Sequence, residues 1–505
     1  MKSGTRNLIV AAACAAVLGG AAFALSRAPG GEGASSAASS SPETELVSKK
    51  SEDVVSMKVT NKKGGYTLLP EAKKAVSSSA SSSASSAAEE VSYTVEGLEG
   101  LPLNTSETES VVRNGFSLVA TKDLGTVSSL ADYGLADPQA EVEVRFRDGT
   151  GFSYKIGSQT ATDSTAYYMC GQNSERVYVV SVDAGLLEDA KYFVSKEILA
   201  VPEDSGAASG STADGSGYDF TRIALSGTNF PQPIEFQKKD AALAMTRPAA
   251  FEPNADKLSA LETALENLSA ETVEAVRPDA AALKKYGLDS PSAAVEFTVN
   301  KKSYKLSLGA QSGKNIYAML DGVDVVYTVA QDNVAAWAQQ RLLDLRSKLI
   351  YLPNIETVKS VRLTRGSEAH ELHISRAEDT SSSAASASSG TKEKSYVYTV
   401  TSTDGKKLDY EENYKHFYQN MIGLSVMGDS QAKPSGAPDA AVEYSYFDKA
   451  GSDTVAFYAD GDRRYIAVKG GVTYGVVAKS SVDDLFALLA KFENGEAIPD
   501  PNAAA

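Results

Sequence analysis

Cysteine is scarce in this sequence of 505 residues. The two cysteines are Cys14 and Cys170, and Cys14 lies in the apolar N-terminal segment, so the two thiols cannot pair within one folded domain. A disulfide framework is therefore excluded, and Cys170 is expected to be a packed, buried side chain. The folded part must be stabilised by apolar cores, and a hydrophobic content of 42% is enough to form them.

Histidine is almost as rare, with three in the whole chain. His370 and His373 are close in sequence, but residues three apart on a strand point to opposite faces and cannot share a metal ion. His416 is expected on the solvated face of a helix. The sequence contains no nucleophile-elbow, P-loop, dinucleotide-binding or zinc-protease motif. It therefore predicts no catalytic residues, no metal ligands and no cofactor.

Positive charge is also in short supply. The chain has 49 Lys and Arg residues against 65 Asp and Glu, which gives a formal net charge of −16. Such an acidic chain is repelled by phosphate backbones, so the sequence predicts no nucleic-acid partner. Tryptophan occurs once, whereas there are 24 tyrosines. An excess of tyrosine suits strands with one hydrated face, where the ring packs and the hydroxyl stays in water.

One long apolar run is present, from Leu8 to Leu25, with basic residues before it. In one interpretation, residues 1–27 are a retained membrane anchor, because the run reaches the lower limit of the ~17–25 residues that span a bilayer. In the other, they are a signal peptide cleaved near Ala24. The first makes a single-pass cell-membrane protein and the second a secreted one. In both, the bulk of the chain is extracytoplasmic.

The motif Pro-x-Ala-x-Val-Glu occurs three times, at intervals of 153 and 147 residues. This spacing predicts one domain type used three times, since solenoid repeats are only ~20–50 residues long. Tyr-Gly-Leu precedes the first two copies, and its glycine is expected to end a short helix in the left-handed conformation with the leucine docked behind it. The third copy lacks Tyr-Gly-Leu and is degenerate. The repeat-defining residues are Tyr133, Gly134, Leu135, Pro138, Val142 and Glu143; Tyr286, Gly287, Leu288, Pro291, Val295 and Glu296; and Pro438, Val442 and Glu443.

Every repeat has the same predicted order of elements: a first strand, a capped helix, the motif strand, the rest of an antiparallel meander and a closing amphipathic helix. Asp148-Gly149 between alternating apolar runs is a hairpin signal. The predicted fold class is α+β, with three tandem domains of antiparallel sheet and packed helices after an N-terminal transmembrane helix and a tether. The expected helix caps are Asn104, Asn254 and Asp409, and the expected closing helices are Val182–Phe193, Asn333–Leu345 and Val482–Phe492.

Stretches rich in serine, alanine and glycine divide the chain. Two of them fall inside predicted hairpins and are read as long disordered loops, whereas a third falls between repeats and is read as a linker. The predicted organisation is an anchor or signal at 1–27, a tether at 28–45, repeat 1 at 46–203 with a loop at 77–88, a linker at 204–217, repeat 2 at 218–352, repeat 3 at 353–496 with a loop at 380–391, and a disordered tail at 497–505.

The recurrent Glu143, Glu296 and Glu443 are the only candidates for a set of catalytic carboxylates. They belong to different predicted domains, whereas paired acids must lie ~5–10 Å apart. We expect each glutamate on the wet face of its strand, alternating with buried valines. The Asp-Gly pairs of the chain lack the ladder of ligands that a calcium loop needs, so hairpin turns explain them better.

Tyr-Gly-Leu-x-x-Pro followed by this meander resembles a bacterial family known as domain of unknown function 4340. The resemblance rests on Tyr133, Gly134, Leu135 and Pro138, and on their counterparts from Tyr286 to Pro291. It implies an exported, membrane-anchored protein, because family members are commonly of that kind. Some occur with ABC-type transporter components linked to gliding machinery, which implies an accessory role at a membrane complex.

The function expected from these observations is non-catalytic. The protein would be a membrane-anchored extracytoplasmic binding or scaffold protein, with the membrane as one partner and an ABC-type transporter or envelope protein as another. One alternative is an envelope enzyme acting on wall polymers. A second is a ligand sensor with a tyrosine-lined cleft between repeats, since pockets commonly form where domains meet.

Overall fold

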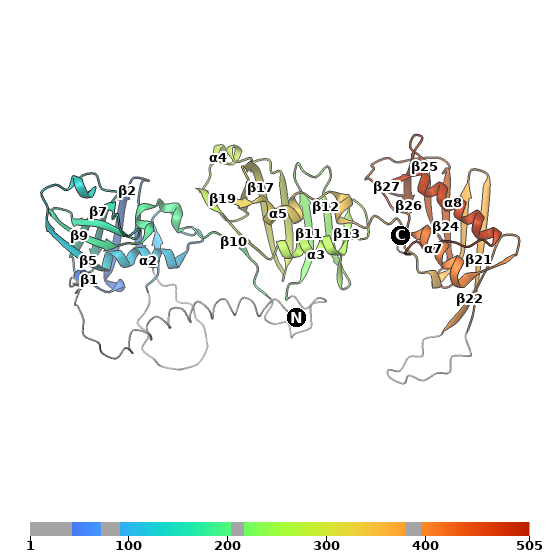
Figure 1. Ribbon diagram of the computed structural model, residues 1–505, viewed down its shortest axis with the longest axis horizontal. Coiled ribbons are helices and arrows are strands. Elements are labelled where there is room, and N and C mark those ends of the chain that lie inside the picture. Colours follow the sequence, from blue (N-terminus) through green and yellow to red (C-terminus); the bar gives the residue numbers. More distant parts are fainter. Residues whose placement is uncertain (1–42, 72–90, 204–216, 379–394, 504–505) are drawn as a thin grey trace, which may run out of the picture. The chain divides into compact units, whose positions relative to one another are not determined.

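The structure is a computed structural model and describes residues 43–71, 91–203, 217–378 and 395–503 (Figure 1). Cys14, the apolar run at 8–25 and the two predicted loops at 77–88 and 380–391 lie outside these ranges, as does the predicted linker apart from Gly217. Within the described residues, no helix has the length and apolar character needed to cross a bilayer. The fold is mostly antiparallel β-sheet with packed helices, which confirms the α+β class.

The chain divides into two compact units. The first contains residues up to Lys62 and from Val111 to Leu186. Its strands lie in the order β1-β5-β9-β8-β7-β6-β2, here called the first sheet, and all neighbours pair antiparallel. The strands are β1 Thr44–Ser48, β2 Val54–Asn61, β5 Ser117–Thr126, β6 Ala140–Phe146, β7 Gly151–Gln159, β8 Ala166–Gly171 and β9 Arg176–Ser181.

The second unit contains residues 63–110 and everything after Leu186. It begins with the hairpin of β3 (Tyr66–Pro70) and β4 (Tyr93–Val95), and helix α2 (Thr105–Phe116) runs from this unit into the first. A short pair follows, β10 (Glu197–Ala200) with β14 (Asn267–Ser269).

The second sheet has the order β13-β12-β11-β16-β17-β18-β19-β15. Helix α3 (Ala255–Ala264) is capped as predicted, since the Asn254 side chain accepts the amide of Lys257. Trp337, the single tryptophan of the chain, is fully buried on α5. The elements are β11 Phe220–Ser226, β12 Ile234–Lys239, β13 Ala242–Arg247, β15 Thr272–Val276, α4 Ala280–Lys285, β16 Ala293–Val299, β17 Lys302–Ser312, β18 Asn315–Leu320, β19 Val325–Ala330, α5 Gln331–Ala338 and α6 Leu342–Leu345.

The third sheet has the order β23-β22-β21-β20-β24-β25-β26-β27. Helices α7 and α8 share one apolar core with its inner face, and Asp409 caps the turn before α7 by accepting the amides of Glu412 and Asn413. The elements are β20 Val358–Arg365, β21 Glu368–Glu378, β22 Tyr396–Thr401, β23 Lys407–Leu408, the π-turn η6 Tyr410–Tyr414, α7 Lys415–Ile422, β24 Ala440–Tyr446, β25 Ser452–Ala459, β26 Arg464–Lys469, β27 Val472–Ala478 and α8 Lys479–Asn494.

The same pairing order surrounds each strand that carries Pro-x-Ala-x-Val-Glu. These motif strands are β6, β16 and β24, and each pairs on one side with an earlier strand: β2, β11 or β20. On the other side each continues into a meander of three further strands. The register of the next strand is also shared, because the motif alanine faces Ile156, Leu308 or Phe457.

Four details differ from the sequence expectations: two of the closing helices, the C-terminal tail and the position of His416. The helix expected over Val182–Phe193 is two 3₁₀ turns, η3 Ala184–Leu187 and η4 Ala190–Phe193. The side chain of Asp183 accepts a hydrogen bond from the amide of Gly185, and the side chain of Asp189 accepts one from the amide of Lys191. Each of these bonds starts a new turn at a point where a continuous α-helix would have to continue. The helix expected over Asn333–Leu345 is likewise divided into α5 and α6.

The C-terminal residues are more ordered than the predicted tail at 497–505. Ile498 is buried in the apolar core between the third sheet and helices α7 and α8, and its amide donates to Asn413 Oδ1 at 2.9 Å. His416, expected to be solvated, is half-buried because its Nδ1 lies 2.9 Å from the carbonyl oxygen of Ile498.

Candidate functional site

The first two Tyr-Gly-Leu segments form tight helix-ending turns. Gly134 follows the 3₁₀ turn η2 (Ala131–Tyr133) with φ +71°, and Leu135 behind it is 1% exposed. Gly287 follows α4 with φ +70°, and the Leu288 amide donates to the Leu283 carbonyl at 2.9 Å. These left-handed glycines confirm the predicted turns.

Each turn packs against a glycine at a bulge in the strand that follows the motif strand. The glycines are Gly157 on β7 and Gly309 on β17, where the pairing to the next strand shifts register. A Cβ atom on Gly157 would collide with the carbonyl oxygen of Tyr133, and one on Gly309 with that of Tyr286. Only glycine therefore allows the turn to dock there.

The third sheet has a tyrosine at the equivalent position. Gly157 follows Ile156 and Gly309 follows Leu308, and Tyr458 follows Phe457 in the same register against the motif alanine. No register shift occurs here, so β25 continues regularly against β26. The third sheet lacks both halves of the docking arrangement, the Tyr-Gly-Leu turn and the glycine beneath it.

The other repeat-defining residues follow strand alternation. Val142, Val295 and Val442 are buried, and the three motif prolines are half-buried. The carboxylates of the three motif glutamates lie on three different sheets, so the structure does not bring them together. Glu143 is exposed, Glu296 lies 3.3 Å from Lys305 Nζ and 3.6 Å from Arg222 Nη1, and Glu443 accepts the Ser452 hydroxyl at 2.6 Å.

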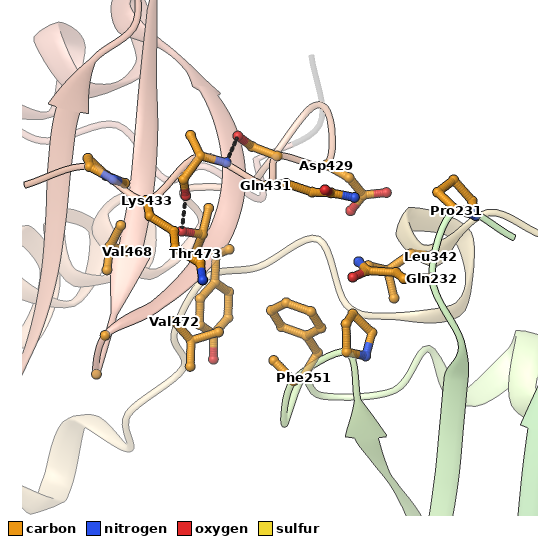
Figure 2. A pocket seen from close by; sticks show the side chains of 18 of the residues that line it. Pro231, Gln232, Phe251, Leu342, Asp429, Gln431, Lys433, Val468, Val472 and Thr473 are labelled. Atoms are coloured by element: carbon orange, nitrogen blue, oxygen red, sulfur yellow. Dashed lines mark hydrogen bonds between the residues drawn. The ribbon is translucent and has the colours of Figure 1, made fainter.

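The candidate site is an open cleft of about 1330 Å³ in the second unit (Figure 2). One wall is formed by β25–β27 and the loop at 429–434, and the other by segments 229–234, 248–251 and 340–342. Along β25, Val455 and Phe457 point into the core, whereas Thr454, Ala456 and Tyr458 line the cleft. The cleft therefore occupies the outer face of the third sheet, in the part where Tyr458 replaces the bulge glycine.

Arg346 connects the two walls and is 1% exposed. Its guanidinium donates to Asp429 Oδ1 at 2.9 Å and to the carbonyl oxygen of Tyr474, and it lies 4.4 Å from the centre of the Phe251 ring. Phe251 and Tyr474 are in edge contact, with ring centres 5.1 Å apart. A buried guanidinium that is paired and stacked in this way defines the geometry of the cleft floor.

A second polar cluster supports the wall behind β25. Asp453 Oδ2 accepts the hydroxyls of Tyr351 at 2.7 Å and Tyr446 at 2.8 Å, and Lys449 Nζ lies 3.0 Å away. Hydrogen bonds from the Tyr351 hydroxyl and from the other donors lower the pKa of Asp453 to about 2. The carboxyl is therefore ionised at neutral pH and cannot act as a general acid.

Several polar side chains that line the cleft have no hydrogen-bond partner within the described ranges. The amide of Gln232 is half-buried, and the ammonium of Lys433 is exposed. The phenol ring of Tyr458 has neither an aromatic nor a cationic neighbour among the described residues. The set is Gln232, Gln431, Lys433, Thr454, Tyr458 and the hydroxyl of Tyr474. The cleft thus presents planar amides, hydroxyls and an aromatic ring that make no hydrogen bond or ring contact with the described residues.

A family model matches residues 80–235 and 244–427, which is more than half of the chain. Its description is "Domain of unknown function (DUF4340)". The chain belongs to this family. The DUF4340 matches are two in number and contain both Tyr-Gly-Leu turns, whereas β24–β27 and Tyr458 lie beyond the second match. No curated protein and no solved structure matches the chain.

The two neighbouring histidines of this DUF4340 protein have different partners. His370 Nδ1 lies 2.9 Å from Glu493 on α8, and His373 Nδ1 lies 3.6 Å from Glu371. Across the described ranges, no group of three or more His, Cys, Asp or Glu side chains could hold a metal ion. Cys170 is 1% exposed, as predicted, and burial raises the pKa of its thiol.

A cleft between repeats was one of the sequence-based alternatives, and this cleft is lined by segments of the predicted repeats 2 and 3, Tyr458 and Tyr474 among them. Its individual residues were not identified, because they come from segments more than 200 positions apart. One signal was present in the sequence. The third motif copy lacks Tyr-Gly-Leu, and that loss marks the sheet on which the cleft lies.

Proposed function

We propose that this DUF4340 protein is a non-catalytic, membrane-anchored extracytoplasmic binding or scaffold protein made of three copies of one α+β domain. Its binding surface is the cleft on the third sheet. Its place is beside an ABC-type transporter or another envelope complex, as the family resemblance implies.

The shared strand order supports the triplication. Each motif strand pairs with an earlier strand on one side and begins a meander on the other, and the three registers agree at the motif alanine. The third copy has diverged in the segment that closes the sheet in the other two. A separate binding role for this copy fits the general rule that function resides in sites carried by a fold and not in the fold itself.

The cleft is the observation that carries the binding role. It is concave, it is lined by aromatic rings and a few convergent polar groups, and its floor is held by a buried, paired arginine. These are the properties of small-molecule and polymer binding sites. Two phenols and an ammonium hold one oxygen of the ionised Asp453, which favours binding over the acid–base chemistry of a wall-polymer hydrolase.

The anchored, exported location rests on the apolar run at 8–25 and the basic residues before it. A protease added to intact cells is expected to degrade the chain while a cytoplasmic marker survives. Protection of the whole chain from the protease would contradict the proposed location.

Site-specific photo-crosslinking in native membranes tests the binding role. A benzoylphenylalanine placed at Gln431, which lines the cleft, is expected to form an adduct on irradiation. The matched control is the same residue at Lys407, which is exposed on β23 of the same sheet and outside the cleft. Equal yields at the two positions would overturn the proposal that the cleft is the binding surface.

A further inference from the structure

We propose that the cleft on the third sheet binds a glycan chain that carries carboxylate groups. This inference rests on the proposed binding function and names the chemical class of its ligand. Three features of the described residues lead to it: a closed strand edge, unpartnered planar and hydroxyl side chains, and one unpaired cation.

The edge of the third sheet beside the cleft is closed to an added strand. The amide of Met427 donates to the Val476 carbonyl at 2.8 Å, and the Val476 amide donates to the Gly428 carbonyl at 2.8 Å. The guanidinium of Arg346 donates a hydrogen bond to the carbonyl oxygen of Tyr474. A peptide that binds by strand addition needs these backbone groups free. Recognition in the cleft must therefore depend on side chains.

The available side chains suit a polyhydroxyl ligand. The amides of Gln232 and Gln431 each offer donors and an acceptor, and Thr454 adds a hydroxyl. A sugar hydroxyl is also both donor and acceptor, so every such group can be paired without burying a charge. The ring of Tyr458 offers an apolar face on which the C–H side of a pyranose ring can lie.

Tyr458 is the residue that the third domain has in place of a glycine. In the first two sheets a side chain at this position would collide with the docked Tyr-Gly-Leu turn. In the third sheet the turn is lost, the strand is regular and the tyrosine lines the cleft. Tyrosine in place of glycine is incompatible with a docked Tyr-Gly-Leu turn, and it places an aromatic ring in the cleft. For this reason we assign the ring to ligand binding.

The charges lining the cleft favour an acidic ligand. Arg341 pairs with Asp344 at 2.9 Å, Asp429 with Arg346 at 2.9 Å, and Asp453 with Lys449 at 3.0 Å. Lys433, labelled in Figure 2, also lines the cleft, and no ion pair involves it within the described ranges. The chain as a whole carries a net charge of −16, so an unpaired lysine is a local positive charge. It can attract a carboxylate on a polymer that is otherwise neutral.

The test is calorimetric titration of the full-length chain in detergent with three probes: tetragalacturonate, its fully methyl-esterified form and tetraglutamate. We expect tetragalacturonate to bind best. Lys433→Gln is expected to weaken tetragalacturonate binding about 10-fold at low salt and to leave binding of the ester unchanged. Tyr458→Gly is expected to weaken both sugars about 10-fold or more.

The controls separate binding from folding. Lys407→Gln removes an exposed lysine from β23 of the same sheet and should change neither titration. Tyr458→Gly introduces the residue found at Gly157 and Gly309, and unchanged far-ultraviolet circular dichroism shows that the fold is kept.

The outcomes distinguish this inference from the proposed function. Binding of tetraglutamate in preference to both sugars would overturn the glycan assignment in favour of an acidic peptide. Equal affinity for the acid and its ester would overturn the role of Lys433. Failure of both sugars to bind, with a photo-adduct at Gln431, would overturn the ligand class and leave the binding function standing; failure of both experiments would remove both.

Discussion

The second and third sheets differ in what covers the strand that follows the motif strand. In the second, the turn at Tyr286–Leu288 docks on Gly309, and the strand bulges to receive it. In the third, Tyr458 occupies that position on a regular strand, and the segment before the motif strand becomes a cleft wall. The comparison shows that this part of the sheet is closed by its own chain where the turn and the glycine are both present, and is left open where both are absent.

The exchange Gly309→Tyr should have the largest effect. The new side chain would collide with the Tyr286 carbonyl and expel the turn, at a cost of about 3 kcal/mol in the free energy of unfolding. Because Trp337 is the single tryptophan and is fully buried on α5, its fluorescence during urea unfolding reports on this domain.

The reverse exchange, Tyr458→Gly, should cost about 1 kcal/mol, mostly from the flexibility of glycine in a strand. Unfolding followed by circular dichroism measures it. Equal costs for the two exchanges would show that the two sheets do not differ in the way described.

Removal of the positive charge of Arg346 at the cleft floor should have the next largest effect after Gly309→Tyr. Arg346→Met leaves Asp429 without its ion-pair partner and Phe251 without its stacked cation. We expect a loss of about 2 kcal/mol in the free energy of unfolding, since Asp429 keeps some solvent and still accepts the amide of Leu343. The matched control is Arg341→Met, whose exposed pair with Asp344 should contribute at most about 0.5 kcal/mol. Similar losses in the two variants would argue against the buried arginine as the organiser of the cleft.

Acid should weaken the third sheet through Asp453. Its folded pKa of about 2 lies below the usual value of 3.8, so the stabilisation is fully present above about pH 4 and is lost as pH falls from 4 to 2. The shift corresponds to at most about 2 kcal/mol. Unfolding measured across this range should show a shallower pH dependence in Asp453→Asn, and the exposed Asp484→Asn should behave like the unaltered chain.

The smallest expected difference is between the helix caps of the two sheets. Asp409 accepts two backbone amides, at 3.0 and 2.8 Å, whereas Asn254 accepts one at 3.3 Å. Asp409→Ala should therefore cost about 1 kcal/mol and Asn254→Ala about 0.5 kcal/mol, as measured by urea unfolding. A larger loss at Asn254 would reverse this order.

Local rules predicted most of the strands and turns. Asp148-Gly149 forms a hairpin, and Asn300 and Lys301, both with positive φ, make the corresponding turn in the second sheet. Strand alternation correctly placed the motif valines inside, and the left-handed conformation of Gly134 follows from its position behind a short helix. In each case the residues that decide the conformation are adjacent in sequence.

Apolar spacing alone misjudged the closing helices. Val182–Phe193 has helical periodicity, but Asp183 and Asp189 bond nearby amides and divide the segment into two 3₁₀ turns. The sequence suggested a cleft between repeats only as a general alternative, and the residues of the cleft could not be predicted, because Arg346 meets Asp429 from 83 positions away and no local pattern marks that pair. A site formed by tertiary contacts between unrelated loops has no sequence period to detect.

One edge of the third sheet is covered, because the backbone of β27 is already bonded to Met427 and Gly428. At the other edge, β23 is two residues long and pairs only with Val400 and Thr401 of β22. Open strand edges are the usual starting points of aggregation, and covered edges prevent it. The edge beside the cleft is therefore protected from pairing with a second copy of the domain when many copies are crowded together.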